Sequence, residues 1–143
     1  MPHPNIYRSY HTSLIRFCRD FADAHGIGFV NMDAHADASS WPEGDFIGLG
    51  EFNVVFGQPD EVMLALAIST KDDLNLLRMA ELTTALVDLV LPTSCIDLYD
   101  AVSGDVIASL TVAEGVKVGA PLPTESQPVQ PVMLRLLSDY VSF

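Results

Sequence analysis

Apolar residues near the start of the chain recur at spacings of three and four, from Ile6 through Tyr10 and Leu14 to Phe21. This period is typical of an amphipathic helix that places one face against a core. Gly26 follows at the position where a helix commonly ends in a left-handed residue. The pattern therefore predicts a helix over Asn5–His25.

After this helix the pattern changes to short apolar runs separated by turn residues. Ile27–Met32 is predicted as a strand, and the polar residues 33–45 that follow are predicted as a loop. Two longer apolar segments, Phe46–Phe56 and Glu61–Ser69, are joined by Gly, Gln, Pro and Asp, which favour a turn. We expect them to pair as an antiparallel hairpin, with a bulge or bend at Gly48–Gly50.

A second helix is predicted over Thr70–Leu91, where leucines recur at helical spacing before Pro92. Thr70 is placed to cap its start, and Asp72 and Asp73 would complement the positive end of the helix dipole. The apolar face is wide, so we expect this helix to be well buried.

The remainder of the chain reads as strands. Ser94–Val102 and Val106–Ala113 flank a Ser-Gly-Asp turn and are predicted to form another hairpin. Residues 120–131 contain four prolines and are expected to form an extended, poorly packed loop or arm. Periodicity alone allows helix or strand for Val132–Phe143; β-branched and aromatic residues favour a strand, with Pro131 suiting its start.

These elements predict one α+β domain over residues 1–143. The expected architecture is a largely antiparallel sheet of about five to six strands, with two helices packed on one face. A chain of this length buries roughly two-thirds of its unfolded surface, and 49% hydrophobic residues supply the core.

The charge is strongly negative and unevenly distributed. The chain carries 19 acidic and 7 basic residues, for a formal net charge of −12. Binding to the phosphates of nucleic acid depends on clustered Lys and Arg, so a chain this acidic is a poor candidate for a nucleic-acid-binding protein. Residues 1–25 have a net charge of +1 and the rest −13, because Arg8, Arg16 and Arg19 all lie in the first helix. Such asymmetry often marks an element that faces a partner, although acid carried for solubility explains the excess equally well.

Two cysteines, Cys18 and Cys95, lie 77 positions apart and form no CxxC pattern. We therefore predict that both are reduced, buried and structural. The longest strongly apolar run, Val62–Ile68, is too short to span a bilayer, so no membrane association is expected.

One motif carries potential chemistry: Asp33-Ala34-His35-Ala36-Asp37 directly follows a predicted strand. If the segment stayed extended, Asp33, His35 and Asp37 would project to one side and could bind a divalent cation such as Mn²⁺. The run resembles the Asp-Ala-His-x-Asp signature of the arginase–agmatinase family, and that resemblance implies a metal-ligand role for these three residues.

That family is longer and has a second motif of the form Ser-x-Asp-x-Asp-x-x-Asp. The nearest stretch here, Ser94–Asp100, spaces its carboxylates differently. A binuclear site would lack half its ligands, so a polar surface loop is the favoured interpretation of residues 33–37. We expect no catalytic residue, no cofactor and no metal.

Other features suit protein–protein contact. Trp41 is a single aromatic residue in the polar loop, where such residues often anchor interfaces. The arginines of the first helix are further candidates, together with three prolines of the predicted arm. The complete set of interface candidates is Trp41, Arg8, Arg16, Arg19, Pro121, Pro123 and Pro128.

The order of elements resembles that of tail terminator proteins of long-tailed bacteriophages, which are also called tail-completion or neck proteins. Those proteins have an amphipathic first helix, antiparallel strands, a central helix on the sheet, further strands and a C-terminal strand. The corresponding segments here are Asn5–His25, Phe46–Ser69, Thr70–Leu91, Ser94–Ala113 and Val132–Phe143.

The resemblance implies a structural virion protein, assembled in the host cytoplasm, that has no enzymatic activity. Six copies would form a ring on the tail tube, end its polymerisation and join it to the head connector. DNA would pass through the ring without specific binding, because acidic walls repel phosphate. Two alternatives stay open: a small metal-dependent hydrolase that uses Asp33, His35 and Asp37, and an acidic module that binds a basic protein.

Overall fold

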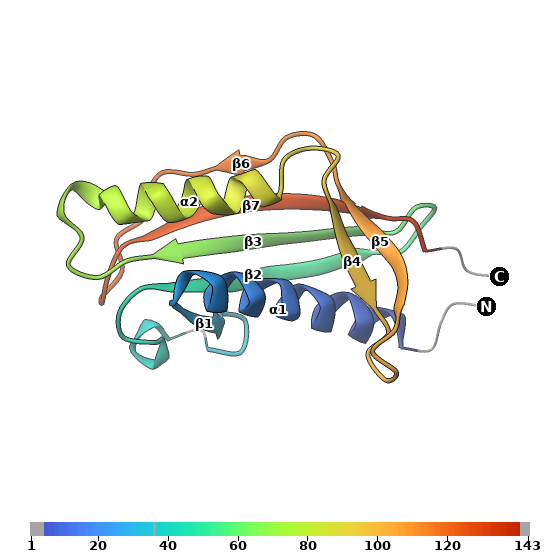
Figure 1. Ribbon diagram of the computed structural model, residues 1–143. Coiled ribbons are helices and arrows are strands. Elements are labelled where there is room, and N and C mark those ends of the chain that lie inside the picture. Colours follow the sequence, from blue (N-terminus) through green and yellow to red (C-terminus); the bar gives the residue numbers. More distant parts are fainter. Residues whose placement is uncertain (1–4, 36, 141–143) are drawn as a thin grey trace.

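The computed structural model describes residues 5–35 and 37–140. Helix α1 spans Ile6–His25 and helix α2 spans Leu77–Leu89, with short 3-10 helices η1 at Ala38–Ser40 and η2 at Leu74–Leu76. The strands are β1 (Gly28–Asn31), β2 (Phe46–Val55), β3 (Glu61–Ser69), β4 (Cys95–Tyr99), β5 (Val106–Val112), β6 (Lys117–Val118) and β7 (Val129–Ser138). Figure 1 shows the strands as one curved layer with the two helices against it.

The strands form one sheet in the order β1-β2-β3-β7-β5-β4, and β6 pairs with the part of β7 that β5 leaves free. Every pairing is antiparallel except that between β1 and β2. The sheet curls into a half-barrel. This confirms the predicted α+β class and the largely antiparallel sheet. Both predicted hairpins form, as β2–β3 and β4–β5.

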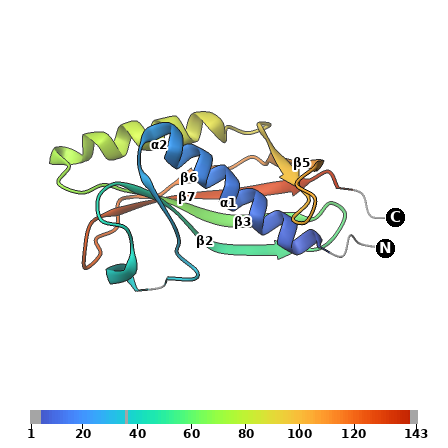
Figure 2. The same cartoon turned by 60° about the horizontal axis from the view of Figure 1, so that its bottom comes forward.

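Both α-helices lie on the same face of the sheet, and even-numbered side chains of β7 show this. The α1 residue Tyr10 places its hydroxyl 2.9 Å from Oγ of Ser138. The α2 residue Thr83 donates a 2.8 Å hydrogen bond to the amide oxygen of Gln130. Because alternate residues of a strand face opposite sides, both contacts are made on one face. The core lies between this face and the helices, and Figure 2 shows α1 lying over the strands.

Helix α1 forms as the periodicity predicts. Its buried side chains are Ile6, Ser9, Tyr10, Ser13, Leu14, Cys18, Phe21 and Ala22. The helix ends at Gly26, whose φ of 65° is left-handed, and the Ile27 amide donates to the Ala22 carbonyl as the chain turns away. The spacing of apolar residues thus placed both this helix and its end.

Helix α2 corrects the prediction, because it starts seven residues later than Thr70. Asp72, Asn75 and Leu76 have φ values of 52°, 58° and 56°, and a right-handed helix cannot pass through left-handed residues. The carboxylate of Asp73 caps the true start by accepting hydrogen bonds from the amides of Arg78 (3.1 Å) and Met79 (2.8 Å).

The expectation that α2 is well buried is also wrong. Only Met79, Thr83 and Leu86 of this helix are buried, while Leu77 is 63% exposed and Leu89 is 50% exposed. α2 contacts the sheet mainly through the two central strands, β3 and β7, so several leucines of its wide apolar face remain at the surface.

The last segment is a strand, as favoured, but it ends at Ser138 and lies inside the sheet; residues 141–143 of the predicted strand lie outside the described residues. β7 begins at Val129, pairs with β3 on one side and with β5 and β6 on the other, and contains Pro131 in its interior. Pro131 therefore does not start the strand. Its carbonyl accepts a bond from the Gly119 amide, so its missing N–H faces β6 and leaves the β3–β7 ladder complete.

Candidate functional site

The chain turns at residues 32–34 and does not continue β1 as an extended strand through Asp33 and His35. The amides of Ala34 and His35 both donate to the carbonyl of Asn31, which folds the chain back directly after β1. Side chains at alternate positions share one side only while the backbone is extended. The condition for a shared metal site at these positions is therefore not met.

The carboxylate of Asp33 is engaged by the backbone of β2. Its two oxygens accept hydrogen bonds from the amides of Glu51 (2.9 Å) and Phe52 (3.1 Å). These amides lie in the register shift between Gly50 and Asn53, where Glu51 has a φ of 52°. Asp33 thus stabilises this irregularity by pairing amides that leave the β2–β3 ladder. The irregularity lies just after Gly48–Gly50, where the bulge was predicted, because those three residues pair with β3 in regular register.

Asp37 and His35 serve the loop that follows. An oxygen of Asp37 accepts a 3.0 Å bond from the Ser39 amide, and this bond and the Ser39 hydroxyl lower the pKa of the Asp37 carboxyl. His35 contributes its carbonyl, which accepts a 2.6 Å bond from the indole N–H of Trp41. Within residues 5–35 and 37–140, no three His, Cys, Asp or Glu side chains gather to hold a metal ion.

Trp41, predicted as a contact residue, is half-buried and closes its own loop. Besides its bond to His35, its ring lies 5.8 Å from that of Phe46 in an edge-to-face arrangement. A cavity of about 380 Å³ lies beside it, lined in part by Arg19, Phe29 and Asn31. Trp41 therefore joins the loop to the start of β2.

The three arginines of α1 are exposed, as expected of candidate contact residues. The Arg16 guanidinium lies 3.8 Å from the centre of the Tyr99 ring, and that of Arg19 lies 5.7 Å from the centre of the Phe29 ring. None of the three forms a salt bridge with a carboxylate in the described part of the chain. Arg16 and Arg19 thus hold their charge beside aromatic rings, and none of the three guanidinium groups is neutralised by a described carboxylate.

The proline-rich segment is anchored to the body of the protein. Pro121 and Pro123 are exposed and Pro128 is half-buried. Between them, Leu122 and Val129 exchange backbone bonds of 2.7 and 2.9 Å. The side chain of Gln127 is buried, and its Nε2 donates hydrogen bonds of 2.7 Å to the Gly44 carbonyl and to the Ser69 hydroxyl.

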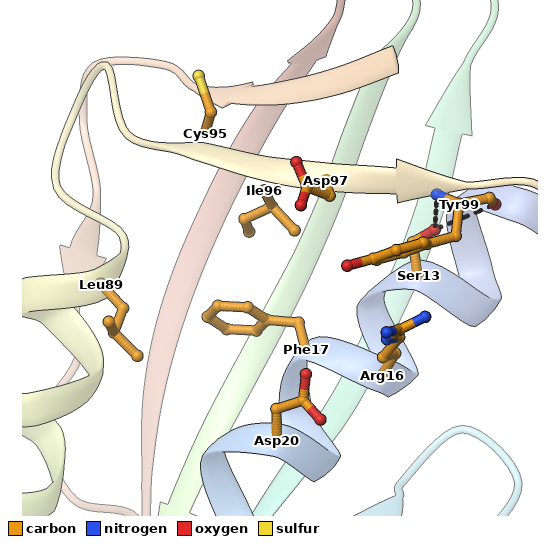
Figure 3. A pocket seen from close by; sticks show the side chains of 9 residues that line it. All are labelled: Ser13, Arg16, Phe17, Asp20, Leu89, Cys95, Ile96, Asp97 and Tyr99. Atoms are coloured by element: carbon orange, nitrogen blue, oxygen red, sulfur yellow. Dashed lines mark hydrogen bonds between the residues drawn. The ribbon is translucent and has the colours of Figure 1, made fainter. Parts of the chain in front are cut away.

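A groove opens between α1 and the outer edge of β4 (Figure 3). Its volume is about 230 Å³. The apolar lining residues are Phe17, Leu89 and Ile96, and the charged ones are Arg16, Asp20 and Asp97. Ser13, Cys95 and Tyr99 complete the wall. The prediction that Cys95 is buried is wrong, because it is exposed at this edge; Cys18 is buried as predicted, and burial raises its pKa to about 12.

Two serines of α1 close one end of this groove. The Ser13 hydroxyl accepts a 2.9 Å bond from the Tyr99 amide and lies 3.4 Å from the Tyr99 carbonyl, as Figure 3 shows. The Ser9 hydroxyl accepts a 3.0 Å bond from the Ala101 amide. The helix thereby satisfies the backbone of β4 at its C-terminal end, where a bare strand edge would otherwise begin.

The rest of the β4 edge is open. Ser94 directs its carbonyl to Val112 of β5 and Tyr99 directs its backbone to α1, so odd-numbered residues of β4 face outward. Cys95 and Asp97 therefore present their N–H and C=O groups to the side that carries no strand, since β4 is last in the strand order. The sequence predicted this strand, but not that it lies at an edge.

β6 is a second open edge. The Gly119 amide donates to the Pro131 carbonyl of β7, so by alternation the backbone groups of Val118 and Ala120 face away from β7. Both residues are exposed, and Val118 is 42% accessible. Among the described strands β6 pairs with β7 alone.

The face of the sheet opposite the helices is apolar at its centre. β3 and β7 present Met63, Ala65, Met133 and Leu137 there, all partly exposed, because their core-facing neighbours have the other parity. Arg135 and Glu61 form a 2.6 Å salt bridge on the same face. Neither α1 nor α2 covers this surface, which we call the helix-free face. Alternating large and small apolar residues in β3 were the signal in the sequence that could have revealed it.

No family model matches the chain, and no curated protein matches it at a significant level. Within the described residues, neither helix combines the length and hydrophobicity that crossing a lipid bilayer requires.

Proposed function

We propose that this chain is a structural virion protein, the tail terminator of a long-tailed bacteriophage. Copies of it form a homo-hexameric ring that caps the tail tube, ends tube polymerisation and joins the tube to the head connector. The mechanism is surface complementarity and involves no catalysis, cofactor or membrane. The protein assembles in the host cytoplasm and resides in the tail neck of the virion.

The observation that carries the proposal is the helix-free face. Met63, Ala65, Met133 and Leu137 leave apolar surface exposed on the two central strands, in a chain that otherwise carries a net charge of −12. Apolar surface that the protein's own helices leave uncovered marks a candidate protein contact. The helix-free face points away from the helix layer, so it is accessible to another protein.

The order of elements adds support, since an amphipathic helix, a hairpin, a central helix, a second hairpin and a last strand follow one another as in those proteins. The acidic excess has a place in the same proposal. If the excess carboxylates line the bore of the ring, they repel the phosphates of passing DNA and keep the genome from adhering.

Native mass spectrometry together with metal analysis tests the proposal. We expect a metal-free hexamer, or a monomer that forms rings on purified phage tail tubes under the electron microscope. Stoichiometric Mn²⁺ or Zn²⁺ that is lost in His35→Ala would overturn the proposal in favour of a metal-dependent hydrolase. A monomer or dimer that does not bind tail tubes but binds a basic protein would overturn the proposal in favour of an acidic binding module.

A further inference from the structure

In the described part of the chain, the outer edges of β4 and β6 have open backbone groups with matching spacing. On β4 the outward groups belong to Cys95 and Asp97, and on β6 and the residues after it they belong to Val118 and Ala120. Each edge thus offers two residues, two positions apart, each with a free N–H and C=O. Such rows pair readily with another strand, and proteins usually protect them.

We infer that the β4 groove of one copy receives the exposed segment Lys117–Leu122 of the next copy in the ring. The two edges pair as adjacent strands, so that the sheet continues from one subunit into its neighbour. This inference rests on the proposed ring and names the surfaces that would close it. Because the two edges are different surfaces, the contact is head-to-tail and leaves one edge free on each outer copy until the ring closes.

Charge favours this occupant over another β4 edge. The acidic residues Asp20 and Asp97 line the groove, and neither forms a salt bridge within the described part of the chain. Its one cation, Arg16, is stacked on the ring of Tyr99. Lys117 is exposed and begins the incoming segment, so it brings a positive charge to this acidic groove. Two β4 edges would instead bring Asp97 of each copy together.

The apolar surfaces also correspond. The groove has an apolar lining of Phe17, Leu89 and Ile96, and the apolar side chain of Leu89 is 50% exposed there. The incoming segment carries Val118 and Leu122, which are 42% and 55% exposed. Pairing the edges buries these side chains, which are costly to leave in water. Ser9 and Ser13 close the other end of β4, so they limit the docked strand to the stretch beside Cys95 and Asp97.

Cross-linking to the native thiol of Cys95 tests the inference. Cys95 is exposed and Cys18 is buried, so a cysteine introduced as Val118→Cys or Ala120→Cys gives each copy two reactive thiols, one on each edge. A short bis-maleimide should then produce a ladder of covalent species longer than a dimer, up to the size of the ring. Leu74→Cys, at an 81% exposed position away from both edges, is the matched control and should give no ladder. Adding Cys95→Ser to either edge variant should abolish the ladder.

Two further variants test the edge itself. Asp97→Pro removes the outward N–H while leaving the β4–β5 bonds in place, and we expect at least a tenfold lower cross-linking yield. Asp97→Asn keeps that N–H, so its cross-linking yield should fall by less. Lys117→Glu should lower the yield, and Asp97→Lys combined with it should restore part of it. Circular dichroism checks that each variant remains folded.

The outcomes separate the inference from the proposed function. If native mass spectrometry shows a hexamer but neither edge cysteine gives a ladder, the docking inference is wrong and the ring stands. Dimers without longer species would show a two-fold contact and overturn the head-to-tail arrangement. If the chain forms no oligomer in solution or on tail tubes and gives no cross-links, the proposed function fails together with the inference.

Discussion

The hydroxyl of Tyr10 joins α1 to the ends of β3 and β7, and its removal should destabilise the fold measurably. Tyr10 is completely buried, and its hydroxyl donates a 2.7 Å bond to the carboxylate of Asp60 while lying 2.9 Å from Oγ of Ser138. Tyr10→Phe keeps the ring in the core and removes only the oxygen. The variant therefore isolates the polar contacts from the packing.

A hydrogen bond to a charged group contributes about 1.5–3 kcal/mol to stability. Asp60 is partly exposed and can regain water, so we expect Tyr10→Phe to lower the free energy of unfolding by about 2 kcal/mol. With a urea m-value of roughly 2 kcal/mol/M for a domain of this size, the unfolding midpoint should fall by about 1 M. Chemical denaturation followed by circular dichroism measures this shift directly.

Tyr7→Phe is the matched control, because Tyr7 lies on the same helix and is 51% exposed. It should change the free energy of unfolding by less than about 0.5 kcal/mol. A double-mutant cycle with Asp60→Asn should give a coupling energy of about 1 kcal/mol or more. A Tyr10→Phe midpoint equal to that of Tyr7→Phe would refute the assignment of this contact as a link between helix and sheet.

The same residue has a signature at alkaline pH. Burial raises the pKa of Tyr10 well above its ordinary value, and its bond to Asp60 adds to this effect. The folded state therefore holds the phenol proton more tightly than the unfolded chain does. Stability should be unaffected below about pH 10 and fall as the pH rises beyond the unfolded value. Tyr10→Phe should lose this part of the alkaline dependence.

Three further predictions concern the loop, a salt bridge and a helix end. Asp33→Ala should lower the free energy of unfolding by about 1–2 kcal/mol in urea denaturation, because it leaves two backbone amides of β2 unpaired. An unchanged unfolding midpoint would contradict the proposed role of Asp33. The hydrogen bonds from Arg78 hold the pKa of Asp45 below 3.8, so the melting-temperature gap between the protein and Asp45→Asn should be full at pH 7 and close as the pH falls below about 4. A gap that persists at pH 2 would argue against this pair as its source. Gly26→Ala should lower the free energy of unfolding by about 1 kcal/mol, because Gly26 has a left-handed φ of 65°. Gly57→Ala, where φ is not left-handed, should lower it by less in the same urea denaturation.

Much of the local structure could be predicted from the order of residues. The three- and four-residue spacing from Ile6 to Phe21 placed α1, and Gly26 placed its end, because both signals act within a few residues. The apolar runs and their turns placed β2 with β3 and β4 with β5 in the same way. These elements set the α+β class, since a sheet and helices with one apolar face each must pack against one another.

The start of α2 and the role of the Asp33 segment could not be predicted, because long-range contacts decide them. Thr70 carries every local signal of a cap, yet the amide of Lys71 donates to the carboxylate of Asp45, 26 residues away, and the α-helix begins only at Leu77. Asp33 stands in a run that resembles a metal motif, yet its carboxylate binds amides 18 and 19 residues further along the chain.

By itself, the sequence determined the α+β class, the position of α1, the two hairpins, and that acid predominates after residue 25; it did not predict β6 or the start of α2. The tertiary structure alone decided which strands are interior and which are edges. β7 lies between β3 and β5 although it is last in the chain, and this leaves β4 and β6 open. The physical reason is that strand order depends on backbone pairing between distant segments, and every residue offers the same N–H and C=O. The side-chain pattern therefore records which face of a strand is buried, but not which strand lies beside it.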